Sequence, residues 1–101
     1  MTQVITTFLQ QQALMLMQAM LGVISPNFRM ISITMLAGTI QIKVVLECES
    51  EEDREELEDC QSEFEALQSE QINYDFEVVV YDGDIEWPSE PAIVIYRRRE
   101  D

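Results

Sequence analysis

Hydrophobic positions near the start of the chain follow the spacing of a helix. Gln, Ala, Leu and Met, which favour helices, dominate the segment from Thr2 to Val23. Its first apolar residues recur at helical intervals, at Val4, Ile5, Phe8 and Leu9. Gly22 tolerates a left-handed cap, and Pro26 disfavours helical geometry in the residue before it. We therefore predict one helix over this segment that stops near Ile24.

The next two apolar runs alternate with the period of a strand. Phe28 to Leu36 and Thr39 to Cys48 are rich in Ile, Val and Thr, and Ala37-Gly38 joins them. If these two residues form the turn, Leu36 pairs with Thr39. That register gathers aliphatic side chains on one face, namely Ile31, Ile33, Met35, Ile40, Ile42, Val44 and Leu46. The opposite face carries Ser32, Thr34, Gln41, Lys43 and Glu47. We predict a hairpin with one covered face and one face mostly in water.

A second helix and two further strands follow. Ser50 is a good N-cap, and the three acids after it lie where the helix dipole favours negative charge. This helix should run to about Gln68, with a narrow apolar stripe of Leu57, Cys60, Phe64 and Leu67. Strand patterns then cover Ile72 to Tyr81 and Ala92 to Arg98. On the last strand we expect Ile93 and Ile95 on one face, and Val94 and Tyr96 on the other.

The predicted order of elements is α-β-β-α-β-β, in two helix-plus-hairpin units. A chain of 101 residues has room for one core of ordinary size, so we expect a single domain over residues 1–101. The simplest architecture is α+β, with a mostly antiparallel four-stranded sheet and two helices on its apolar face.

Charge divides the chain into two unlike parts. Residues 1–46 contain no acid and only two bases, Arg29 and Lys43, whereas Glu47 to Glu90 contains eighteen acids and one base, Arg54. The net charge is -14 at pH 7. A field of this sign repels phosphate backbones and anionic lipid headgroups. We therefore expect neither nucleic acid nor a membrane surface as a partner.

The residue inventory argues against catalysis. The chain contains no His, which removes the commonest general base, the commonest transition-metal ligand and every triad that depends on imidazole. Two cysteines, Cys48 and Cys60, are too few for a disulfide scaffold. The apolar run from Ala13 to Ile24 is too short to span a bilayer, and Met1 to Phe8 lacks the basic residues of a secretory signal. We expect a cytoplasmic, non-enzymatic protein with no cofactor and no metal.

The second predicted helix presents an almost purely anionic outer face. At 100° per residue, the acids Glu51, Glu55, Glu58 and Asp59 point away from the apolar stripe, and Glu52 flanks them. Like charges at i, i+4 cost about 0.2–0.5 kcal/mol per pair, and only Arg54 relieves them. Two interpretations stay open here. The face is either a docking surface for a cationic partner or a solvated face that keeps the protein in solution.

The segment from Asp82 to Pro91 is long and acidic, and two prolines stiffen it. Its acids Asp82, Asp84 and Glu86 have part of the spacing of a calcium loop but lack the remaining ligands, so we expect no calcium site. Trp87 either anchors an interface from this rigid loop or folds back to cap the sheet. The arginines of the terminal Tyr96-Arg97-Arg98-Arg99 run should protect a strand edge and pair with the chain's own carboxylates.

The first helix offers a further surface. It is apolar nearly all round from Ala13 to Ile24, and it contributes three of the chain's six methionines from Met15 to Met20. Such side chains fill a core, or they form a plastic binding or dimer surface. We expect some of this helix to pack against a second copy of the chain or under the long loop.

Five segments form a characteristic set, namely Ile24 to Met30, Glu49 to Glu56, Phe64 to Gln68, Trp87-Pro88 and Tyr96 to Glu100. In size, charge and segment order the chain resembles small acidic bacterial immunity proteins of the polymorphic-toxin and contact-dependent growth inhibition type. The resemblance implies an inhibitor that binds the C-terminal toxin domain of a secreted effector, commonly a basic nuclease, and blocks its active site or substrate groove. It transfers no individual residue.

The partner-binding residues predicted from the sequence are Glu51, Glu52, Glu55, Glu58, Asp59, Asp82, Asp84, Glu86 and Trp87. With them we expect the chain to occlude a cationic toxin domain. The alternative is an acidic, secretion-chaperone-like dimer that holds an effector segment on its sheet or first helix.

Overall fold

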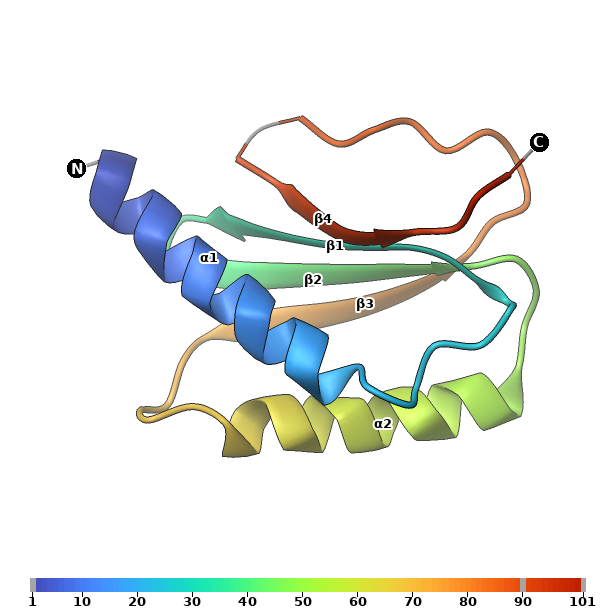
Figure 1. Ribbon diagram of the computed structural model, residues 1–101, viewed down its shortest axis with the longest axis horizontal. Coiled ribbons are helices and arrows are strands. Elements are labelled where there is room, and N and C mark those ends of the chain that lie inside the picture. Colours follow the sequence, from blue (N-terminus) through green and yellow to red (C-terminus); the bar gives the residue numbers. More distant parts are fainter. Residues whose placement is uncertain (1, 90, 101) are drawn as a thin grey trace.

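The computed structural model describes residues 2–89 and 91–100. Its elements are α1 (Thr2–Ala19), β1 (Phe28–Leu36), β2 (Thr39–Leu46), α2 (Glu51–Ala66), β3 (Tyr74–Val80) and β4 (Ile93–Arg97). The predicted α-β-β-α-β-β order is confirmed, as is the α+β class with two helices and a four-stranded sheet. Figure 1 shows α1 crossing in front of the strands, α2 below them and the connection between β3 and β4 above them.

The hairpin of β1 and β2 has the predicted register. Leu36 pairs with Thr39, and the two residues between them have positive φ, 51° at Ala37 and 80° at Gly38. Two consecutive positive φ values are the signature of a type I′ turn, whose twist matches that of the strands it joins. The inward side chains Ile31, Ile33, Ile40, Ile42, Val44 and Leu46 are all buried.

The last two strands do not pair with each other, so the prediction of two helix-plus-hairpin units is wrong. The order across the sheet is β3-β2-β1-β4, with β3 parallel to β2 and β4 antiparallel to β1. Parallel neighbours need a crossover connection, and α2 supplies it between β2 and β3. The long segment after β3 then carries the chain across the sheet to its opposite edge, where β4 pairs with β1.

Both helices pack on the same face of the sheet. Leu9, Leu16 and Met20 from the first helical region and Leu57, Cys60 and Phe64 from α2 join the inward strand residues in one buried cluster. Helix α1 ends at Ala19, earlier than the predicted Ile24, and the chain continues in turns that place Gly22 at a φ of 80°. Glycine adopts this left-handed geometry without a steric penalty, so the helix stops before it.

The other face of the sheet is less open to water than predicted. Met30, Ser32 and Val45 point to that side and are buried, because the segment after β3 lies over them. The face assignment on β4 also changes, because a register shift inserts one extra residue opposite Ile31 and Ser32. Tyr96 consequently packs on the core side together with Ile93 and Ile95, not with Val94.

Candidate functional site

The acidic residues predicted on α2 all lie on its exposed side. Leu57, Cys60 and Phe64 fix the orientation of the helix, since their side chains are buried in the core. Ser50 caps it as predicted, accepting a hydrogen bond from the backbone nitrogen of Asp53 at 3.1 Å. The outward residues are therefore Glu51, Glu52, Glu55, Glu58 and Asp59.

The charge of this acidic face is not neutralised within the molecule. Arg54, the only base on α2, lies 2.6 Å from Glu49, a residue before the helix. Hydrogen bonding between the two lowers the pKa of Glu49 and raises the pKa of Arg54. Among residues 2–89 and 91–100, no ion pair includes a carboxylate of α2 itself. Like charges thus stand at i, i+4 along an exposed surface with no cation between them.

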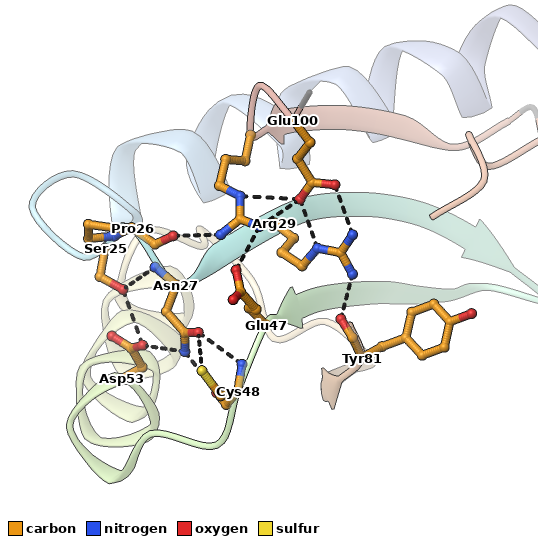
Figure 2. A network of polar contacts seen from close by, with 10 residues as sticks. Ser25, Pro26, Asn27, Arg29, Glu47, Cys48, Asp53, Tyr81 and Glu100 are labelled. Carbon is orange, nitrogen blue, oxygen red and sulfur yellow. Dashed lines mark hydrogen bonds and ion pairs between the residues drawn. The ribbon is translucent and has the colours of Figure 1, made fainter. Parts of the chain in front are cut away.

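A polar network holds the start of α2 against the chain that precedes β1. Asp53 is the one acid of α2 that is buried, and it accepts hydrogen bonds from Ser25 Oγ at 3.1 Å and Asn27 Nδ2 at 2.9 Å. Asn27 also bonds the backbone nitrogen and carbonyl of Cys48, at 2.9 and 2.8 Å. Figure 2 shows these groups around Asn27. This network was not predicted from the sequence, where its signal is the run Ser25-Pro26-Asn27.

The second predicted part of the site is the crossing loop, residues 82–91, of which Glu90 is not described. Asp82, Asp84 and Glu86 are exposed. Trp87 is 66% exposed, so it does not fold into the core, and the guanidinium carbon of Arg97 lies 5.2 Å from its ring centroid. A cation at this distance over an indole is held by the quadrupole of the ring.

The two predicted parts lie on opposite faces of the sheet. Helix α2 covers the face of the buried core, whereas the crossing loop lies over Met30, Ser32 and Val45 on the other side. They approach each other at one end of the sheet, because parallel β2 and β3 both end there and α2 begins four residues after Glu47. Asp82 and Glu47 line a hollow of about 460 Å³ at this end.

Arginines and carboxylates from β1, from the end of β2 and from the C-terminal residues meet in that hollow. Arg29 is only 6% exposed, and it binds both carboxylate oxygens of Glu100 at 2.8 Å. Arg98 contacts Glu100 at 2.9 Å and Glu47 at 2.8 Å, as expected for a base that pairs with the chain's own carboxylates. The hydrogen bond from Arg29 is the main reason why the pKa of Glu100 falls to about 2.

A bulge explains how a charged residue of β1 reaches this cluster. Phe28 pairs with Leu46 and Met30 with Val45, so Arg29 is the extra residue and its side chain turns away from the regular alternation. Arg29 was not predicted to be a functional or structural residue. Its signal was a lone charge in the otherwise uncharged strand 28–36.

Other features of the described chain offer little chemistry. Within residues 2–89 and 91–100 no three His, Cys, Asp or Glu side chains are placed to hold a metal ion. Burial raises the pKa of the Cys60 thiol to about 11, which leaves it protonated at neutral pH. In the same part of the chain, no helix has the length and hydrophobicity to cross a membrane.

Comparison with protein families gives a match that covers most of the chain. The model of the family described as MafI2 immunity protein matches residues 10–100. A comparison with curated proteins gives no match. The matched region includes the acidic helix, the crossing loop and the C-terminal arginine cluster. This chain belongs to the MafI2 immunity protein family.

Proposed function

We propose that this chain binds a cationic toxin domain, of the kind found in basic nucleases, and neutralises it by covering its active site or substrate groove. The observation that carries the proposal is the row of α2 carboxylates without a cation partner. Membership of an immunity family supports the toxin as the partner. The protein contributes no catalysis of its own in this proposal.

The mechanism is electrostatic and steric. A groove that binds phosphates is cationic, and a rigid helix lined with carboxylates can occupy it in place of the nucleic acid. The i, i+4 repulsion that α2 carries in the free protein becomes attraction once lysines or arginines of the toxin lie between its acids. Asp82, the first residue of the crossing loop, adds an exposed carboxylate at the end of the sheet near the start of α2.

Inhibition of the cognate toxin domain tests this proposal. We expect stoichiometric loss of toxin activity when the wild-type chain is added. The double variant Glu55→Lys and Asp59→Lys should need a higher concentration for the same inhibition. Glu70→Lys with Glu77→Lys is the matched control, since it changes net charge equally with exposed acids outside α2. Equal potency of the two double variants would contradict a specific role for α2.

We also propose that two copies of the chain associate through α1. Leu14, Met17 and Leu21 are spaced i, i+3 and i+7 around the helix and its end, and they are 64%, 47% and 78% exposed. Residues 1–28 contain no charged side chain, so this is the surface where two chains of charge -14 repel least. A cationic toxin gains no electrostatic attraction there.

Self-association and toxin binding should depend on salt in opposite directions. Self-association through α1 should strengthen from 50 to 500 mM NaCl, because salt screens repulsion between the acidic copies, whereas toxin binding should weaken. Sedimentation of the wild type and Leu14→Gln at both concentrations tests this. A monomer under all conditions would overturn the dimer and leave the toxin proposal intact.

A further inference from the structure

The crossing loop is held in place by two arginines that lie outside it. We propose that Arg29 and Arg97, with Glu100 orienting Arg29, are positioning residues that keep the loop in one shape ready for the toxin. This rests on the proposed function, because it assigns the loop as part of the toxin-binding surface. The inference names the residues that fix the shape of the loop and the kind of toxin side chain that the loop binds.

The first anchor lies where the loop begins. Arg29 Nη1 donates a hydrogen bond to the carbonyl oxygen of Tyr81 at 2.5 Å, one residue before Asp82. The other side of the same guanidinium is occupied by the two oxygens of Glu100 (Figure 2). Arg98 in turn donates to Glu100 and, at 2.8 Å, to the carbonyl of Pro26. Glu100 therefore sets the direction in which Arg29 presents its remaining donor.

The second anchor lies in the middle of the loop. Arg97 Nη2 donates to the carbonyl oxygen of Ile85 at 2.9 Å, and its guanidinium carbon lies 5.2 Å from the centroid of Trp87. A single side chain on β4 thus fixes both the backbone and the aromatic residue of the loop. Trp87 keeps most of its surface in solvent while one face of its ring is covered.

Backbone hydrogen bonds contribute little to the shape of the loop. Among the described residues 82–89 and 91, the backbone-to-backbone hydrogen bonds are limited to one, from Ala92 nitrogen to Ser89 oxygen at 3.1 Å. A segment of this length would ordinarily lose conformational entropy when it binds a partner. Anchoring it beforehand removes part of that loss, which is the general advantage of a preorganised binding loop.

The anchored loop encloses a hollow with a defined chemistry. The space between loop and sheet is about 470 Å³ and has apolar walls from Met30, Val45, Ile85 and Trp87. Asp84 and Glu86 outnumber Lys43, the one cation among its described lining residues. An apolar hollow bordered by carboxylates suits the side chain of a lysine or arginine, which has an apolar stem and a cationic head. We therefore assign it to a basic side chain of the toxin.

Trp87 reports on the loop directly, because it is the only tryptophan of the chain. The experiment is time-resolved fluorescence anisotropy of the free protein, for the wild type, Glu100→Gln and the control Glu70→Gln, with far-UV circular dichroism to verify the fold. We expect a larger amplitude of fast local motion in Glu100→Gln only, with Glu100→Asp restoring part of the wild-type value. Should Glu100→Gln fail to fold, Arg97→Gln removes the second anchor and gives the same test. Unchanged fast motion in the folded variants would overturn the positioning role.

Binding to the cognate toxin domain is the second readout. Glu100→Gln should bind about tenfold more weakly, with the change in the dissociation rate, because the loop must be ordered during binding. If local motion rises while affinity stays the same, the loop is anchored but does not contact the toxin, and this inference is wrong. If the wild type binds no toxin, the proposed function fails, whereas the anisotropy result still decides whether the anchors position the loop.

Discussion

Arg29 and Glu100 are 71 residues apart in the chain and form a bidentate ion pair, with both nitrogen-to-oxygen distances at 2.8 Å. The pair joins the bulge of β1 to the residues that follow β4. Because Arg29 is buried, its charge depends on this partner for compensation. The pair lies at the end of the sheet where α2 begins. It is therefore close to the start of the acidic helix and to the start of the crossing loop.

The Arg29–Glu100 pair predicts a specific dependence of stability on pH. Hydrogen bonding to Arg29 lowers the pKa of Glu100 to about 2 in the folded protein, below the value of about 4.3 for an unfolded glutamate. A lowered folded-state pKa contributes stability that is present above the unfolded pKa and is lost as pH falls towards the folded one. Urea unfolding should show wild type more stable than Glu100→Gln at pH 6 and the difference reduced at pH 2.5. A difference that grows on acidification would contradict this assignment.

Removing the side chain of Asn27 should lower the stability of the protein more than is usual for a partly exposed polar residue. Its side chain bonds the backbone nitrogen and carbonyl of Cys48 and the buried carboxylate of Asp53. Asn27→Ala leaves these groups without that partner, so the free energy of unfolding should fall by about 1–3 kcal/mol. Asn73→Ala, at an exposed position, is the control and should change it by less than about 0.5 kcal/mol. Thermal unfolding of both variants measures the contrast, and equal melting temperatures would rule out the network as a stabilising element.

The two cysteines should react at very different rates. Cys48 is exposed, whereas Cys60 is buried on the inner side of α2 with a pKa raised to about 11. Since the thiolate is the reactive form, iodoacetamide at pH 8 should alkylate Cys48 first and leave Cys60 protected until the protein unfolds. Peptide mass spectrometry over time gives both rates. Comparable rates in the native protein would mean that α2 does not pack as described.

Trp87 should act mainly on the lifetime of the toxin complex. Loss of an aromatic anchor at an interface often costs 2 kcal/mol or more, roughly thirtyfold in affinity. Trp87→Ala should therefore raise the dissociation rate while leaving the association rate close to that of the wild type. Surface plasmon resonance separates the two rates. Trp87→Phe should recover part of the lifetime, and an unchanged dissociation rate in Trp87→Ala would exclude Trp87 from the interface.

The locally determined parts of this fold could be predicted from the sequence. The hairpin from Phe28 to Leu46 and the cap at Ser50 depend on residues close together in the chain, and the structure confirms both. The acidic face of α2 follows from helical periodicity alone, so its exposure was equally predictable. Its role in binding stays a prediction.

Pairing across the sheet could not be predicted in the same way. That β3 joins β2 and β4 joins β1 depends on the crossover through α2, which no local pattern specifies. The strand order also explains why the sheet face opposite the helices is covered. The chain must cross that face to pass from β3 at one edge to β4 at the other. Met30 and Val45, two apolar residues on the expected wet side, were the available sign of that cover. The pairing of Arg29 with Glu100 could not be predicted, because 71 residues separate the two in the chain.

The association rate with the cognate toxin domain, followed from 50 to 500 mM NaCl, tests whether the acidic face of α2 is the toxin-binding surface. The wild-type rate should fall steeply with salt, because exposed charges act mainly on the encounter. The Glu55→Lys and Asp59→Lys double variant should associate more slowly at low salt and show a flatter dependence, while the Glu70→Lys and Glu77→Lys control keeps most of the wild-type slope. If the α2 double variant matched the wild type in both rate and salt slope, α2 would be a solvated face and not the toxin-binding surface.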